Sequence, residues 1–275
     1  MSDRSDVRTA AAFEESWKRV GIVYTREQFL DWFDPLTPDD LRGREVLELG
    51  FGNGSLLVHV AACGPARLVG IDLGDTIEHT RRLLEGVAGV DVQLVRGDLT
   101  RAELGAFDVV YCIGVIHHLS NPHEGLRAVL RHTRPGGRFH CWVYAREGNG
   151  VIRLFVEPLR RIASRAPWWV AKYVFALPLV VPYYLFAKML RAAGLLGVRS
   201  PLRSLPLFDY TRWIAAREFR FFHHVATDQL ITPTTHYIPR STIESWLRDP
   251  AVDPESVYVI FRNGNSWKFG GRRRA

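Results

Sequence analysis

Cysteine is scarce in this sequence of 275 residues: only Cys63, Cys112 and Cys141 are present, and no two of them have CxxC spacing. Cysteines so few and so scattered supply neither a disulfide framework nor a thiolate metal site. The N-terminal residues 1–4 lead into no apolar segment of the kind found in a signal peptide. We therefore expect free, buried cysteines, no metal site and a cytoplasmic location.

Uncharged apolar segments of membrane-spanning length are lacking as well. The run over residues 173–187 has 15 residues and contains Pro178 and Pro182, whereas a helix needs about 20 apolar residues to cross a bilayer. This run therefore predicts no transmembrane helix. With 47% hydrophobic residues, the chain still has enough apolar side chains for a full core, as one large domain or as a domain with an elaboration.

Acidic residues are almost missing from one segment. Between Ala145 and Ser204, ten Lys or Arg stand against Glu147 and Glu157, a net charge of +8, which leaves −1 for the remainder of a chain whose total is +7. The basic character therefore belongs to this segment alone. No aromatic and basic RNA-binding module is appended to it, and we expect no nucleic-acid partner.

What the chain does contain is a glycine-rich turn between an apolar run and a helical pattern. Residues 45–49 are mostly apolar, Gly50, Gly52 and Gly54 alternate with other residues, and residues 55–60 resume at helical spacing. A strand, turn and helix of this kind lets a ligand approach the backbone and offers it the free N–H groups of a helix N-terminus. The third glycine comes two residues after the second, whereas in the dinucleotide-binding fingerprint it comes three residues after the second. Such a turn also occurs as a purely structural loop.

Further apolar runs of strand length follow, and polar residues stand at or after their ends. In order, they are residues 66–73 with Asp72, 90–95 with Asp98, 107–114 with His117 and His118, and 138–144 after Pro135-Gly136-Gly137. Parallel strands joined by helices present their carboxyl ends at one edge of the sheet, where ligands bind. A carboxylate about 20 residues past the glycine turn accepts two ribose hydroxyls in such sites. Asp72 also suits a helix cap or turn, and Asp98 a turn.

Taken together, these motifs resemble those of the class I S-adenosylmethionine (SAM) dependent methyltransferases. The motifs are Glu48-x-Gly50-x-Gly52-x-Gly54, the acids Asp72 and Asp98, Gly114-Val115-Ile116-His117-His118-Leu119-Ser120-Asn121-Pro122, and Arg134-Pro135-Gly136-Gly137. The resemblance covers residues 41–144 and 239–269. It implies an α/β fold, a doubly wound Rossmann-like sheet of seven strands, with a large, mostly helical insertion between the fifth strand and the last helix.

The resemblance also implies SAM as cofactor and a set of residues that hold it. On the motif positions these are Glu48, Gly50, Gly52, Gly54, Asp72, Leu73, Asp98, Leu99 and Cys112. Aromatic residues at helical spacing between residues 7 and 33 predict two amphipathic helices. In the resembling family such N-terminal helices often cover the cofactor, which makes Trp17 or Tyr24 a further contact. The alternative is that these aromatics only pack the helices on the sheet.

Residues after the fifth strand depart from the minimal fold. Apolar runs on either side of Asn263-Gly264 predict a closing hairpin, and residues 240–247 predict the helix before it. We therefore expect four parts: residues 1–40 as an N-terminal helical lid, 41–144 as the SAM-binding core, 145–239 as a helical cap, and 240–275 as the last helix and hairpin. The apolar segment 168–190 has three interpretations: helices packed on the core, a hydrophobic lid over the acceptor, or a peripheral membrane contact.

Histidines are the candidates for proton removal from a hydroxyl acceptor. We favour His118 and His236, with His117 and His223 as further candidates and Tyr237 as an orienting residue, although a lone histidine is more often structural. We expect methyl transfer to a small acceptor through a hydroxyl or an amine, the acceptor being apolar, glycosidic or lipid-linked, in specialised metabolite or glycan biosynthesis. No Pro-Pro-Tyr-type or Pro-Cys motif for nucleic-acid methylation follows the fourth strand. The alternatives are an NAD-dependent oxidoreductase and a SAM-binding protein that docks on a membrane or partner without transferring methyl groups.

Overall fold

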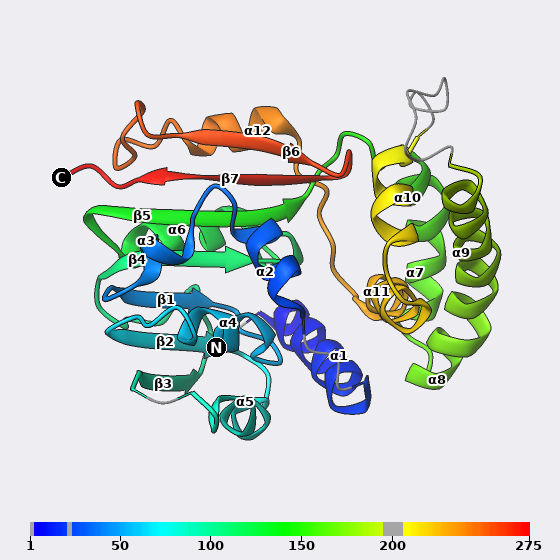
Figure 1. The fold of residues 1–275 in the computed structure, drawn as a ribbon, viewed down its shortest axis with the longest axis horizontal. Coiled ribbons are helices and arrows are strands. Elements are labelled where there is room, and N and C mark those ends of the chain that lie inside the picture. Colours follow the sequence, from blue (N-terminus) through cyan, green and yellow to red (C-terminus); the bar gives the residue numbers. More distant parts are fainter. Residues whose placement is uncertain (1–2, 21–23, 88, 195–205) are drawn as a thin grey trace.

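The computed structural model describes residues 3–20, 24–87, 89–194 and 206–275, and its centre is a sheet of seven strands (Figure 1). The strands are β1 Glu45–Leu49, β2 Arg67–Asp72, β3 Asp91–Arg96, β4 Phe107–Ile113, β5 Thr133–Tyr144, β6 Tyr258–Arg262 and β7 Ser266–Arg272. Their order is β3-β2-β1-β4-β5-β7-β6. The first five are parallel, and β7 is antiparallel to both β5 and β6.

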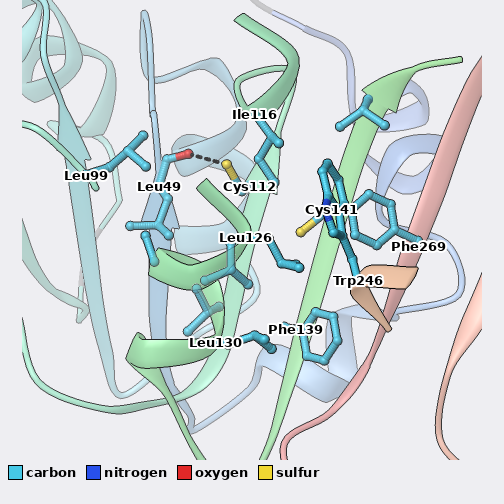
Figure 2. Close-up of a cluster of buried hydrophobic side chains, with 14 of the residues drawn as sticks. Leu49, Leu99, Cys112, Ile116, Leu126, Leu130, Phe139, Cys141, Trp246 and Phe269 are labelled. Carbon is cyan, nitrogen blue, oxygen red and sulfur yellow. Dashed lines mark hydrogen bonds between the residues drawn. The ribbon is translucent and has the colours of Figure 1, made fainter. Parts of the chain in front are cut away.

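Helices cover both faces of this sheet. Those of the core and its N-terminal extension are α1 Arg4–Val20, α2 Arg26–Phe33, α3 Pro38–Leu41, α4 Ser55–Ala61, α5 Ile77–Leu84, the 3₁₀ turn η1 Ile116–His118, α6 Pro122–His132 and α12 Arg240–Trp246. On one face, Leu126 and Leu130 of α6 and Trp246 of α12 pack on the strands (Figure 2). On the other, Phe29 and Phe33 of α2 pack with α4. The predicted doubly wound sheet is therefore confirmed.

The central strands have the composition of strands buried on both faces. Val46, Leu47 and Leu49 of β1 are completely buried, as expected where helices cover a parallel strand on either side. Strand β5 begins at Thr133, earlier than the run at residue 138 predicts, because Arg134-Pro135-Gly136-Gly137 enters the strand as an irregularity opposite Phe107 and Val109 of β4. The Pro-Gly-Gly segment therefore belongs to β5, at the point where its pairing with β4 shifts register.

The closing hairpin is confirmed at the predicted position. Strands β6 and β7 pair directly on either side of Asn263-Gly264. Both residues have positive φ, +50° at Asn263 and +66° at Gly264, which is the backbone that an Asn-Gly turn adopts at least cost.

The chain between β5 and α12 forms a helical cap. Its elements are the π-helical turn η2 Ile152–Val156, α7 Glu157–Ala163, α8 Trp168–Val170, the π-helical turn η3 Ala171–Ala176, α9 Leu177–Ala192, α10 Phe208–Ala215 and α11 Phe219–Ile231. Ala145 and Ile238 pair as the chain leaves and returns. Figure 1 shows the cap beyond the carboxyl ends of the parallel strands, with α1 in contact with α11. Residues 195–205, which include Arg199 and Arg203 of the basic segment, lie outside the described residues.

Elements α8, η3 and α9 follow one another without a break as one helix, Trp168–Ala192. It has 25 residues and is mostly apolar, so it is long and apolar enough to cross a membrane, by length and composition alone. The helix is longer than the uncharged run of 15 residues indicated, and the absence of a transmembrane helix stays a prediction. The uncharged run counted only part of the helix, and the prolines do not end it: Pro178 comes two residues after the π-helical turn η3, and Pro182 lies inside α9.

Candidate active site

The glycine turn after β1 is fixed by contacts that exclude larger residues. Gly50 and Gly52 have φ of +84° and +58°. A Cβ on Gly50 would lie 2.4 Å from Cγ2 of Val115, and a Cβ on Gly52 would lie 2.7 Å from Cη2 of Trp17. Because the backbone angle and the close neighbours both require glycine, the turn brings bare backbone against α1 and against the segment after β4.

Asp72, at the end of β2, holds this turn in place. Its Oδ2 accepts a hydrogen bond from the Gly52 N–H at 2.9 Å, and its Oδ1 accepts one from the Gly74 N–H at 2.7 Å. Burial raises the pKa of this carboxyl, and the two backbone donors oppose that rise. Each carboxylate oxygen accepts more than one hydrogen bond, so Asp72 anchors the turn and still offers acceptors to a ligand.

Glu48 lies beside the same turn and is 1% exposed. The Tyr111 hydroxyl donates to its Oε2 at 2.7 Å. Burial raises the pKa of Glu48 to about 8, although the bond from Tyr111 acts in the opposite direction. A cationic group of a ligand placed here would favour the ionised form.

These residues line a cavity that reaches from the glycine turn to the cap. On the side of the core it is lined by Glu48, Gly50, Gly52, Asp72, Leu73, Leu99, His117 and His118. From the N-terminal segment come Phe13, Trp17, Tyr24 and Trp32. The wall toward the cap consists of Trp142, Tyr144, Tyr210, Trp213, Phe221, His224, Val225, Asp228 and Arg262. The cavity therefore joins the predicted cofactor residues to an aromatic compartment.

Trp17 and Tyr24, the two N-terminal aromatics predicted to contact the cofactor, both lie in this wall. Trp17 stacks on Phe13 with ring centroids 5.2 Å apart, and Tyr24 meets Trp32 edge-on. Helix α1 thus places one aromatic pair over the glycine turn.

Three residues predicted to bind the cofactor do not line the cavity. Cys112 is fully buried and its thiol donates to the Leu49 carbonyl at 3.1 Å, inside the core (Figure 2). Gly54 is the N-cap of α4, and a Cβ on it would clash with the Thr80 side chain. Asp98 accepts hydrogen bonds from the backbone and hydroxyl of Thr100, while the adjacent Leu99 does reach the cavity. Contact of Asp98 with an adenine ring stays a prediction.

The predicted histidines fall into two groups. His117 and His118 of η1 both line the cavity. The Nδ1 of His118 lies 2.9 Å from the Thr234 carbonyl, so Nδ1 carries the proton and Nε2 the lone pair. Burial lowers the pKa of His118 to about 3 and that of His117 well below its ordinary value. Neither ring is easily protonated.

His223, His236 and Tyr237 are outside the cavity wall. The His223 ring bonds to the Lys172 carbonyl at 2.9 Å, within the cap. His236 uses its backbone N–H to bind the His117 carbonyl. Tyr237 accepts from the Arg160 guanidinium at 3.1 Å and stacks on Tyr144. His236 and Tyr237 therefore contact residues of the cavity wall without lining the cavity themselves.

Sequence reasoning missed a pair on α11. His224 and Asp228 both line the cavity, with Nε2 of His224 3.1 Å from Oδ2 of Asp228. The Ser16 hydroxyl of α1 donates to the other Asp228 oxygen at 2.6 Å. Within the described residues, Nδ1 of His224 has no hydrogen-bond partner. The i, i+4 spacing of His224 and Asp228 on a helical pattern was the available signal.

Comparisons with known proteins agree with this geometry. A family model described as a methyltransferase domain matches residues 46–137. The ubiquinone biosynthesis O-methyltransferase of Thiobacillus denitrificans is 31% identical over 175 residues, which is 60% of this chain and 69% of that protein. The chain belongs to the class I SAM-dependent methyltransferases. The family predicted from the motifs is thereby confirmed, and with it SAM rather than a nicotinamide.

Other members of the family match over different extents. The enzyme of the same name from Neisseria meningitidis serogroup C is 31% identical over 162 residues, 57% of this chain and 65% of that protein. This methyltransferase chain therefore spans just under two thirds of that relative's length. The solved structure of magnesium protoporphyrin IX methyltransferase from Synechocystis PCC 6803, with bound S-adenosylhomocysteine (SAH), has a TM-score of 0.54 at 14% identity and covers 98% of this chain and 97% of that one. It has the same fold.

The residues of this methyltransferase fit SAM. Gly50 and Gly52 expose backbone in the cavity wall, Asp72 offers carboxylate acceptors for ribose hydroxyls, and Leu99 offers an apolar surface for a ring. Among the residues that the structure describes, no group of three His, Cys, Asp or Glu is placed to hold a metal ion.

Proposed function

We propose that this protein is a SAM-dependent O-methyltransferase whose acceptor is a small, apolar molecule bearing a ring and a hydroxyl. The observation that carries the proposal is the cavity that continues from Asp72 and the glycine turn to the aromatic wall formed by Tyr210, Trp213 and Phe221. One end suits the cofactor, and the other is large, aromatic and shielded by the cap.

SAM supplies a methyl group on a positively charged sulfur, which is already a good leaving group. The chain's own task is therefore to orient the acceptor and exclude water. Trp17 and Phe13 of α1 close the cavity over the glycine turn. Trp142 and Tyr144, edge to face at 5.1 Å, form a rigid part of the wall between the two ends of the cavity.

His224 is the best candidate for the base that removes the hydroxyl proton. Its Nε2 faces the Asp228 carboxylate, so the proton sits on Nε2 and the lone pair on Nδ1. A carboxylate behind a histidine stabilises the imidazolium that forms when the ring accepts a proton. His118 has a carbonyl rather than a carboxylate behind it, and burial lowers its pKa to about 3, which makes it a poor base near neutral pH. Asp228 acts as the positioning residue.

The chemistry of the wall supports the acceptor class. Trp142 and Trp213 have buried indole N–H groups without partners within the described residues, and these suit oxygen substituents on a ring. Arg262 lies over the rings of Trp32 and Trp213 and is neutralised by Asp31. Relatives named for ubiquinone biosynthesis support an oxygenated ring that carries an apolar, lipid-like chain.

Two steps test the proposal. Isothermal titration with SAH and, separately, with NADH establishes the cofactor, and we expect micromolar binding of SAH alone. Purified protein is then incubated with SAM and a panel of phenols, catechols, sugars and aryl amines, with SAH release and product mass as readouts. Methylation confined to hydroxyls of apolar rings supports the proposal, whereas turnover of amines or sugars alone contradicts it.

A further inference from the structure

The outer side of the cap carries a continuous apolar face. Every exposed side chain of the helix Trp168–Ala192 between Trp169 and Met189 is uncharged. These residues are Trp169, Tyr173, Val174, Pro178, Leu179, Val181, Pro182, Leu185, Phe186 and Met189, which we call the outer face of α9. Met189 is 70% exposed and Leu185 57%. An exposed apolar surface of this extent marks an interaction site.

The opposite side of the same helix packs against the other helices of the cap. Ala171, Ala176, Val180 and Ala187 are buried against α10 and α11 and the other cap helices. The Tyr184 hydroxyl donates to the Arg217 carbonyl at 2.9 Å. Because one side is bound to the cap and the other is apolar and exposed, the helix is suited to lie in the plane of an interface rather than to cross a bilayer.

Charge identifies the kind of interface. Residues 158–194 contain six Lys or Arg and no Asp or Glu. Three of these cations are exposed: Arg161 in α7, Arg165 just after it, and Arg191 near the end of α9. Arg160 is buried, and Lys188 donates to the Arg217 carbonyl on the cap side of the helix. Cations that flank an apolar face are the arrangement that attracts anionic lipid headgroups while the face inserts among acyl chains.

We propose that the outer face of α9 seats this protein on the surface of a membrane that contains anionic lipids, with the helix in the membrane plane. Exposed Leu154, Phe155 and Ile162 on η2 and α7 extend the apolar area. Figure 1 shows α9 at the edge of the cap farthest from the sheet. The core therefore does not stand between the outer face of α9 and a membrane surface. This inference does not depend on the acceptor or on catalysis.

Co-sedimentation with vesicles tests the proposal. The intact protein is pelleted with vesicles of phosphatidylcholine alone and of phosphatidylcholine mixed with phosphatidylglycerol, at low and high salt. The test variant is Leu185→Gln with Met189→Gln, which removes apolar area without adding charge. The matched control is Leu30→Gln on α2, an exposed leucine away from the face. SAH affinity and thermal melting confirm that each variant is folded.

We expect binding to the mixed vesicles, weaker binding to phosphatidylcholine and at high salt, and a loss of about tenfold or more in the double variant but not in the control. Pelleting that is absent, or equal in wild type and double variant, would overturn the proposal. Sedimentation velocity without lipid adds a second arm: if the protein forms a dimer that the double variant dissociates, a second copy covers the face and the proposal is wrong.

Discussion

Substitution of Gly52 by alanine isolates the contact between the glycine turn and its lid. The new Cβ would lie 2.7 Å from the Trp17 ring, whereas carbon atoms prefer about 3.5 to 4.0 Å. The turn is held against movement away from Trp17, because the Gly52 N–H donates to Asp72 and the Gly52 carbonyl accepts from the Thr76 hydroxyl. The Trp17 ring must therefore move by about 1 Å, the difference between those distances.

Gly43→Ala is the matched control. Gly43 has a φ of +66°, close to the +58° of Gly52, and a Cβ there would meet nothing within 4 Å. Both variants should lose about 1 to 2 kcal/mol of stability from the left-handed backbone. Only Gly52→Ala should also lose SAH affinity, by about tenfold or more, which corresponds to about 1.4 kcal/mol.

Isothermal titration of SAH and thermal melting measure the two effects separately. A double-mutant cycle with Trp17→Ala assigns the cause: if the clash is responsible, Gly52→Ala should cost little affinity once the ring is gone. Equal SAH affinity in the Gly52 and Gly43 variants would refute the role given to the turn and its lid.

Three further substitutions, one of them with a matched control, test the site. Asp72→Asn should lower SAH affinity by about tenfold or more, because the charged acceptor of the ribose hydroxyls is lost; unchanged titration would remove Asp72 from the contact. His224→Asn should lower kcat by about 10²-fold or more while SAH affinity holds, and the neighbouring His223→Asn, outside the cavity wall, should lower it far less. Glu48 has a folded pKa of about 8 against an ordinary 4.5, so only the folded state holds its proton between those values. The free energy of unfolding should therefore fall by about 1.4 kcal/mol per pH unit as the pH rises through that window. Denaturant unfolding of Glu48→Gln over the same pH range should not show this decrease.

The succession of strands along the chain was predictable because each strand depends on local signals. The apolar runs with Asp72 and Asp98 at or after their ends, and the Asn263-Gly264 turn, specify strands and turns through neighbouring residues alone. The glycine turn was predictable for the same reason. The partner of Gly52 was less so, since the contact with Trp17 joins residues far apart in the sequence.

The cap was not predictable to the same depth. Which side of α11 faces the cavity depends on how α11 docks against α1 and α9, and a one-residue difference exchanges His223 for His224. The sequence analysis named His223 as a candidate, whereas His224 is the residue that lines the cavity. The length of the helix through Pro178 and Pro182 was also hidden, because a proline ends a helix only where its missing N–H and its ring conflict with the surroundings.

Helix α11 connects the proposed base to the proposed membrane face. His224 and Asp228 line the cavity, while Phe222 of the same helix packs on Tyr183 and Tyr184 of α9. An acceptor with a lipid-like chain would therefore meet the protein at a surface that is one helix layer from the cavity.

Leu185→Gln with Met189→Gln should then leave kcat/KM unchanged for a water-soluble phenol and lower it about tenfold for the same ring on a chain embedded in anionic vesicles. Initial rates of SAH release with both acceptors decide the matter, with Leu30→Gln as control. Equal losses on the two acceptors would mean that the substitutions disturb the site itself, and no loss on either would separate membrane contact from acceptor capture.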